Sequence, residues 1–199
     1  MIEVEIKVQI SDPQKIRKRF EEQGGKYIIS LSHEDTYYNM PKKLRDFRKT
    51  DEALRIRKST EYDKQNESKK QTNNYLTYKG AKLDNSTKTR EEIETLIDDG
   101  EKLKKILDNL GFRAVLTIKK ERDLYHFDYE GAEIEALIDY IPILESHFIE
   151  VEIQAESSRQ IELSRDLLFD FLSKFQIEKK DSIRKSYLEL ILEKLGSMN

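Results

Sequence analysis

The sequence contains no cysteine among its 199 residues, which excludes disulfide bonds and thiolate metal sites. It also lacks an apolar run long enough to cross a membrane as a helix. No signal peptide precedes the first predicted strand, so we expect a cytoplasmic protein without a membrane partner. A basic excess is missing too, since 36 Lys and Arg residues face 39 Asp and Glu residues. Proteins that bind nucleic acid through its phosphates are basic, so we do not expect a nucleic-acid partner.

What the sequence does contain is charge of both signs. Charged residues make up 38% of the chain and hydrophobic residues 37%, which is enough for a modest core and too apolar for a disordered chain. The length suits one domain, and we predict a single domain over residues 1–199.

The stretch at residues 1–8 alternates with period two and predicts a strand. Its apolar face holds Ile2, Val4, Ile6 and Val8, and its charged face holds Glu3, Glu5 and Lys7. An exposed edge strand can alternate in this way for solubility. In a closed barrel, by contrast, the apolar face can pack under outer helices while the charged face lines the lumen. On this stretch alone both interpretations stay open.

The rest of the chain predicts a barrel. Strand-like runs follow at residues 26–40, 53–57, 75–80, 88–96, 113–127, 133–141 and 147–155. Helical patterns occupy the stretch after Asp12, which can cap a helix, and residues 99–110, 157–175 and 183–195. Residues 41–52 read as a loop, and residues 59–74, almost devoid of apolar side chains, as a long hairpin tip or a mobile loop. Because βαβ alternation is absent, we predict an α+β fold: a mostly antiparallel, eight-stranded, closed β-barrel with helices packed outside.

The charges in these strands are ordered. If the alternating faces share one lumen, its acids are Glu3, Glu5, Glu92, Asp139, Glu150 and Glu152, and its bases are Lys7, Arg55, Arg57, Lys79, Arg90, Lys120 and Arg122. Unpaired buried ions cost several kcal/mol each, so such a lumen needs water, mutual pairing and a highly charged ligand. A triphosphate suits the arginines and lysines, and a carboxylate cluster suits Mg²⁺ or Mn²⁺.

The ordered motifs resemble the CYTH family, also called triphosphate tunnel metalloenzymes, along nearly the whole chain. The matching motifs are Glu3-x-Glu5-x-Lys7, Asp35-Thr-Tyr-Tyr38, Ala53-Leu-Arg-Ile-Arg57, Tyr78-Lys79-Gly80, Arg90-x-Glu92, Lys120-x-Arg122-x-x-Tyr125, Asp139, Phe148-x-Glu150-x-Glu152 and Ser186-Tyr-Leu-Glu-Leu-Ile191. The family includes class IV adenylyl cyclases, thiamine triphosphatases and inorganic triphosphatases, and its fold is an eight-stranded antiparallel tunnel. The chain departs from the pattern at residues 142–147, where Glu145 and Ser146 replace Leu-Gly, so the alignment of Asp139 stays open.

The resemblance implies a role for each matching position. The implied ligands of a divalent cation, Mg²⁺ or Mn²⁺, are Glu3, Glu5, Asp139, Glu150 and Glu152. The implied phosphate-binding residues are Lys7, Arg55, Arg57, Lys79, Arg90, Lys120 and Arg122, of which Lys7, Lys79, Lys120 and Arg122 are the implied catalytic residues.

The resemblance is strongest to the class IV adenylyl cyclase group, which implies conversion of ATP to cyclic AMP and pyrophosphate. One alternative is a tripolyphosphatase or a thiamine or nucleoside triphosphatase, and another is a non-catalytic module that binds polyphosphate or a nucleotide. The expected partner is thus a small triphosphate, namely ATP, tripolyphosphate or thiamine triphosphate. A homodimer stays open.

Overall fold

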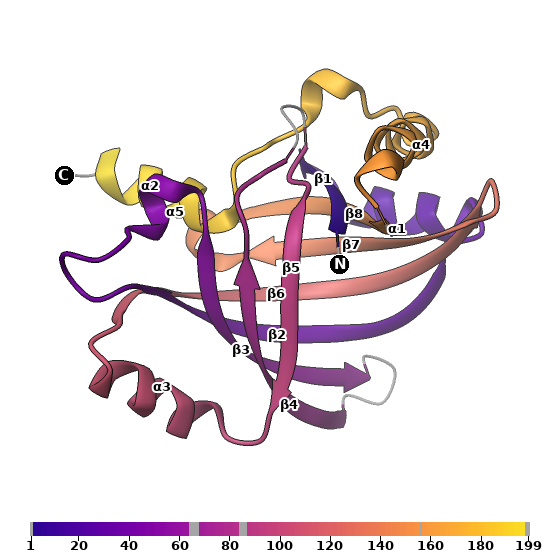
Figure 1. Cartoon of the computed structure of the whole chain (residues 1–199). Coiled ribbons are helices and arrows are strands. Elements are labelled where there is room, and N and C mark those ends of the chain that lie inside the picture. Colours follow the sequence, from indigo (N-terminus) through magenta and orange to yellow (C-terminus); the bar gives the residue numbers. More distant parts are fainter. Residues whose placement is uncertain (1, 64–67, 84–86, 156, 198–199) are drawn as a thin grey trace.

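The computed structural model describes residues 2–63, 68–83, 87–155 and 157–197. Its strands are β1 (Ile2–Ile10), β2 (Lys26–Asn39), β3 (Ala53–Asp63), β4 (Ser68–Lys79), β5 (Arg90–Ile97), β6 (Arg113–Tyr129), β7 (Ala132–Ile141) and β8 (Ser146–Ala155). They form one closed barrel in the order β1-β5-β4-β3-β2-β6-β7-β8, and every neighbouring pair is antiparallel (Figure 1). The predicted α+β fold with an eight-stranded antiparallel barrel is confirmed.

The α-helices are α1 (Pro13–Glu22), α2 (Phe47–Thr50), α3 (Gly100–Asn109), α4 (Ile161–Ser173) and α5 (Tyr187–Ser197). The side chain of Asp12 caps α1 by accepting a hydrogen bond from the amide of Lys15 at 2.9 Å. Asp99 caps α3 in the same way, at 2.9 Å from the amide of Lys102. Within the described residues, no helix has both the length and the apolar character needed to span a membrane.

The main hydrophobic core lies outside the barrel, between the sheet and two helices. The apolar face of β1, with Val4, Ile6 and Val8, packs in one cluster with Phe20 of α1 and Leu168 of α4. Figure 1 shows α1 and α4 lying over this side of the barrel. Fully burying each such side chain contributes about 1.5–3 kcal/mol. The apolar face of β1 is therefore turned outward, and its charged face must point into the lumen.

Of the two alternatives predicted for residues 59–74, the structure shows the hairpin. Its strands β3 and β4 continue through most of this stretch, with Thr60 opposite Thr72, so the tip is shorter than predicted. The tip at residues 64–67 lies outside the described part of the chain. The predicted loop at 41–52 contains α2, and the last two helices begin four residues later than predicted, at Ile161 and Tyr187.

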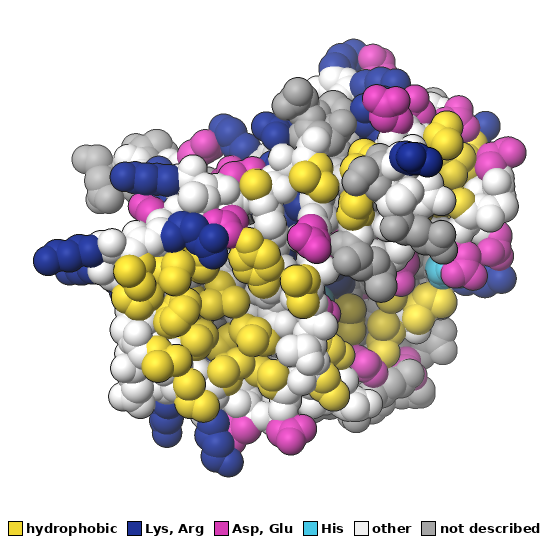
Figure 2. Space-filling view, viewed as in Figure 1, with side chains coloured by type: hydrophobic (Ala, Val, Ile, Leu, Met, Phe, Trp, Pro, Cys, Tyr) yellow, Lys and Arg dark blue, Asp and Glu magenta, His cyan; other side chains and the backbone are white. Residues whose placement is uncertain are grey.

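A smaller apolar cluster lies on the opposite side of the barrel. Leu103 and Leu107 of α3 pack there with Ile56 of β3 and Leu76 of β4. Figure 2 shows apolar side chains gathered on this face. Ile93 of β5 is 58% exposed. Helix α3 therefore covers only part of the apolar outer face of these strands.

Candidate active site

A cavity of about 1300 Å³ occupies the barrel lumen and one of its mouths. The predicted site residues that line it are Glu3, Glu5, Arg55, Arg57, Lys79, Arg90, Lys120, Arg122, Glu150 and Glu152. Lys7 and Asp139 are not among its lining residues. The structure thus brings ten of the twelve predicted residues together around one space.

Four carboxylates line one side of the lumen, and two arginines line the side across from them. The acidic arc, on the neighbouring strands β1 and β8, consists of Glu3, Glu5, Glu150 and Glu152, and Glu5 pairs in register with Glu152. In the closed strand order, β3 lies across the barrel from these two strands. It carries Arg55 and Arg57. A ligand in this lumen would therefore meet anionic and cationic walls at once.

The two arginines of β3 are held by acidic neighbours. Arg57 donates two hydrogen bonds to Asp35 of β2, at 2.7 and 2.8 Å. Arg55 donates to Glu94 of β5 at 3.1 Å and lies 3.7 Å from Asp35. Burial alone would raise the pKa of Asp35, but Arg57 and Arg55 outweigh it and hold that pKa well below its usual range. The paired carboxylates fix the arginines in place, which lowers the entropy cost of binding an anion.

Arg55 also has an unused donor. Among the described residues, its Nε and the Nδ1 of His33 are the buried side-chain polar atoms without a hydrogen-bond partner. A buried donor without a partner costs about 1–3 kcal/mol. An oxyanion in the cavity could supply the missing acceptor.

Lys88, which the sequence analysis left out of the site, lies at the centre of the acidic arc. Its ammonium group donates to Glu5 Oε1 and, at 2.8 Å, to Glu150 Oε1. Burial alone would lower the pKa of Lys88, but Glu150 and Glu5 outweigh it and the pKa is raised. Lys88 lies two residues before Arg90 and therefore continues the alternation of Arg90, Glu92 and Glu94. This pattern could have identified Lys88 as a site residue from the sequence.

Asp139 is engaged in a buried network. It accepts hydrogen bonds from Arg122 at 2.8 and 2.7 Å and from the hydroxyl of Tyr187 at 2.8 Å. Arg122 also donates to Glu150 at 2.6 Å. In this structure Asp139 therefore orients Arg122, and its assignment as a metal ligand stays a prediction.

Lys7 lies beneath the C-terminal helix. Its ammonium group donates to the carbonyl oxygen of Lys185 and lies 4.1 Å from the ring centre of Tyr187. Burial, with a further contribution from the charge of Lys88, lowers the pKa of Lys7 to about 7. Burial likewise lowers the pKa of Lys120 to about 7, assisted by Arg122. Tyr187, which the sequence analysis quoted only within a motif, thus contacts both Lys7 and the predicted metal ligand Asp139.

Two carboxylates of the acidic arc have raised pKa values, whereas Lys88 and Arg122 outweigh burial at Glu150 and lower its pKa. Burial raises the pKa of Glu5 to about 7, and the nearby Glu150 carboxylate adds to the rise. Burial and the charges of Glu3 and Glu5 raise the pKa of Glu152 well above its usual range. Crowded carboxylates in a wet cavity are suitable oxygen donors for Mg²⁺ or Mn²⁺. Within the described residues, however, no group of three or more acidic or histidine side chains forms a ready-made metal site.

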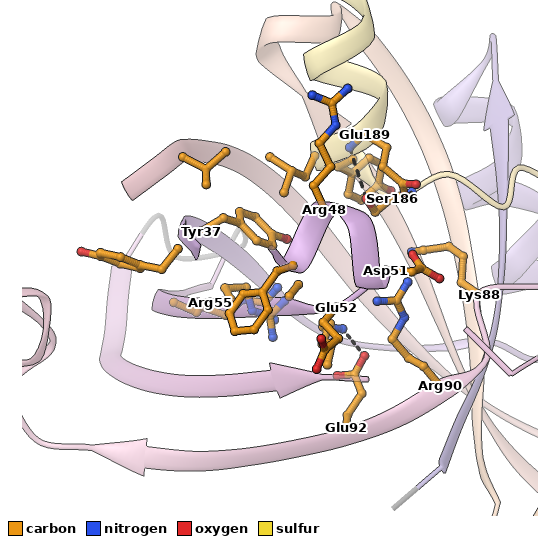
Figure 3. Close-up of a pocket in the computed structure, with 18 of the residues that line it drawn as sticks. Tyr37, Arg48, Asp51, Glu52, Arg55, Lys88, Arg90, Glu92, Ser186 and Glu189 are labelled. Atoms are coloured by element: carbon orange, nitrogen blue, oxygen red, sulfur yellow. Dashed lines mark hydrogen bonds and ion pairs between the residues drawn. The ribbon is translucent and has the colours of Figure 1, made fainter. Parts of the chain in front are cut away.

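Helices α2 and α5 flank the mouth of the cavity (Figure 3). The lining near these helices mixes apolar side chains, among them Phe47, Leu188 and Leu192, with charged ones such as Arg48 and Glu189. Figure 3 shows Ser186 and Glu189 beside the C-terminal helix, with Arg55, Lys88 and Arg90 below them in this view. The cavity therefore combines the charged side chains of the strands with aromatic, aliphatic and further charged side chains at α2 and α5.

Comparison with known proteins gives concordant matches. The CYTH domain model matches residues 1–187. A Methanocaldococcus jannaschii protein named "Putative adenylate cyclase MJ0240" is 40% identical over 190 residues, covering 96% of this chain and 98% of that protein. The solved structure of the PH1819 protein from Pyrococcus horikoshii has a TM-score of 0.82 and 36% identity, covering 96% of this chain and 99% of the other.

A more distant structure is that of a Hippeastrum protein described as a putative adenylyl cyclase with a dominant triphosphatase activity. Its TM-score is 0.62 at 16% identity, with 96% of each chain covered, so it supports the fold alone.

Proposed function

Because this chain belongs to the CYTH family, we propose that it is a divalent-metal-dependent enzyme that acts on a triphosphate inside the barrel, with ATP cyclisation as its reaction. The observation that carries this proposal is the meeting of a carboxylate arc and an arginine and lysine arc in one cavity. A module that only binds anions has no use for four carboxylates facing its ligand. The name of the Methanocaldococcus jannaschii relative supports the same reaction.

The mouth of the cavity favours a nucleotide over a bare phosphate chain. Tyr37 and Phe47 offer aromatic rings, and Leu188 and Leu192 add apolar surface to the cavity lining. A base and a ribose bury well against such side chains, whereas phosphates do not. The volume of about 1300 Å³ exceeds the usual range for small-molecule sites, so a whole nucleotide fits.

In the proposed reaction the 3′-hydroxyl oxygen of ATP forms a bond to the α-phosphorus. The bond from that phosphorus to the bridging oxygen of the β-phosphate breaks, pyrophosphate leaves, and the hydroxyl proton passes to water. Arg55, Arg57 and Arg122 would bind phosphate oxygens and hold the chain in line for attack, which is the main requirement of such transfers. Asp35 and Asp139 keep these guanidinium groups oriented.

The acidic arc would hold the divalent cation. Its candidate ligands are the side chains of Glu3, Glu5, Glu150 and Glu152, whose crowded, hard oxygen donors fit Mg²⁺ or Mn²⁺. When bound, the cation would supply charge neutralisation on the phosphate oxygens.

The second candidate is a triphosphatase, in which the oxygen of water forms a bond to the terminal phosphorus. The bond from that phosphorus to the bridging oxygen breaks, the diphosphate leaves, and orthophosphate is released with it. The charged side chains of the strands favour it, because they can hold tripolyphosphate without any contact to a base. The description of the Hippeastrum protein points in the same direction.

Product analysis separates the two candidates. The protein is incubated with ATP, thiamine triphosphate and tripolyphosphate under Mg²⁺ and under Mn²⁺, and the products are separated by ion-exchange chromatography. Cyclic AMP with pyrophosphate supports the cyclase. Orthophosphate alone, with tripolyphosphate hydrolysed faster than ATP, would replace it with the triphosphatase.

Glu5→Gln tests the metal dependence of either activity. The change keeps the size of the side chain and removes its charge, so turnover should fall by orders of magnitude while the circular dichroism spectrum is retained. Full activity of this variant, or of the wild type in excess EDTA, would contradict a metal-dependent reaction.

A further inference from the structure

Lys88 occupies the place in the acidic arc where a cation is most needed. Its ammonium group is shared by Glu5 Oε1 and Glu150 Oε1. The three residues are 9%, 5% and 4% exposed, respectively, so this cluster is nearly shielded from water. The single positive charge of Lys88 thus neutralises part of the negative charge of the Glu5 and Glu150 carboxylates.

The carboxylate oxygens that Lys88 uses are those that a divalent cation would use. The other oxygen of Glu150, Oε2, accepts from Arg122 at 2.6 Å, so both oxygens of this side chain are engaged. Among the described residues no group of three or more acidic or histidine side chains is arranged as a metal site. The ammonium group and a divalent cation therefore compete for the same donors.

The side chain of Lys88 can leave without disturbing the barrel. Its backbone amide donates to the carbonyl oxygen of Glu5 at 3.1 Å, which anchors the main chain two residues before β5. The lysine stem has four rotatable methylene groups and a compact charge. Figure 3 shows Lys88 and Arg90 reaching into the cavity from the same stretch of chain. Phosphate oxygens bound near Arg90 would offer the ammonium group an alternative partner.

We propose that Lys88 is a tethered counter-ion that keeps the acidic arc closed to divalent cations until a triphosphate draws its ammonium group away. The inference rests on the proposed function, since it takes the acidic arc as the metal-binding wall. It assigns Lys88 a positioning role and makes the binding of metal and triphosphate positively coupled. A fixed structural ion pair would contribute nothing to this coupling, which would then come only from contact between the cation and the phosphate oxygens.

Titration of the protein with Mn²⁺ alone, without any phosphate, tests this competition. Binding is followed by calorimetry and by the electron paramagnetic resonance signal of free Mn²⁺. Lys88→Met removes the charge at similar side-chain length and should bind Mn²⁺ about tenfold or more tightly than the wild type, within the usual range of coupling between sites. Lys88→Arg keeps a cation and should retain the weak binding of the wild type.

Lys79→Met is the matched control. Lys79 lines the same cavity but pairs with Glu92 rather than with Glu5 or Glu150. The Lys79→Met substitution therefore removes one positive charge, as Lys88→Met does, but leaves the ion pairs of Lys88 with Glu5 and Glu150 in place. Its Mn²⁺ affinity should change by less than about threefold, which distinguishes competition at one site from a general change in potential. Equal affinities of the wild type and Lys88→Met would overturn the inference, and so would an equal gain in Lys79→Met.

A measurement on the wild type covers the case in which Lys88 variants do not fold. Its melting temperature is recorded with Mn²⁺, with tripolyphosphate, and with both, keeping Mn²⁺ in excess. The inference requires a combined shift larger than the sum of the two separate shifts, so additive shifts overturn it.

The failure of the inference can be told from failure of the proposed function. If triphosphate turnover requires Mn²⁺ but the wild type and Lys88→Met bind Mn²⁺ equally, only the role of Lys88 is wrong. If neither protein binds Mn²⁺, with or without tripolyphosphate, the metal-dependent function fails and the inference fails with it.

Discussion

Replacing Asp139 with Asn separates two roles for this carboxylate, a metal ligand and an anchor for Arg122. Asp139 is fully buried and accepts from Arg122 at 2.8 and 2.7 Å and from Tyr187 at 2.8 Å. If it is an anchor, the variant loses stability even when no metal is present. If it is only a ligand, stability without metal is unchanged and metal affinity falls.

The structure sets the expected magnitude. Removing one partner of a buried ion pair costs about 3–5 kcal/mol. Arg122 keeps its bond to Glu150 at 2.6 Å, and the amide oxygen of Asn can still accept from Tyr187. We therefore expect a loss just below that range, about 2–3 kcal/mol. For a domain of this size this corresponds to a melting temperature lowered by about 4–12 °C.

Urea unfolding in EDTA, followed by far-ultraviolet circular dichroism, measures the loss. Glu133→Gln is the control, because Glu133 lies exposed on the same strand and the charge change is the same. That control should stay within about 0.5 kcal/mol of the wild type. Unchanged stability of Asp139→Asn together with at least tenfold weaker Mn²⁺ binding would refute the anchor role.

Three further predictions follow from the same structure. Arg57→Ala should weaken metal-free tripolyphosphate binding by about 1.5–3 kcal/mol, measured by calorimetry, because a charged hydrogen bond to phosphate is lost; unchanged affinity would count against the basic arc. Phe171→Ala should lower the free energy of unfolding, measured in urea, by about 3–5 kcal/mol, because the buried ring of Phe171 packs on that of Phe127 with 4.8 Å between the ring centres. A loss below about 1 kcal/mol would place α4 outside the core. Arg57 and Arg55 outweigh burial and lower the pKa of Asp35 in the folded state, so its contribution to stability is complete above about pH 5 and is lost as the pH falls through the folded-state pKa. The stability difference between wild type and Asp35→Asn should therefore shrink as the pH is lowered from about 5, and a constant difference would contradict the shift.

The sequence by itself determined the strands, the direction of their faces and the family. The alternation of Ile2, Val4 and Ile6 with Glu3 and Glu5 has period two, which separates an apolar face from a charged face. The later strands of the chain then favoured a closed barrel with the charged face inside. At residues 59–74 the sequence did not decide between a hairpin tip and a mobile loop, because polar side chains on both faces give no alternation, although the strands pair there.

Only the tertiary structure decided which charges meet. The alternation shows on which face of a strand a side chain lies, but not which other side chain it contacts. That contact depends on barrel closure and strand register. Lys88 reaches Glu5 from 83 residues along the chain. Asp139 lies within reach of Tyr187 because α5 folds back onto the barrel, a contact that no local pattern encodes. Coulomb energy falls with distance and with solvent exposure, so the roles of these groups were fixed by the fold that buried them side by side.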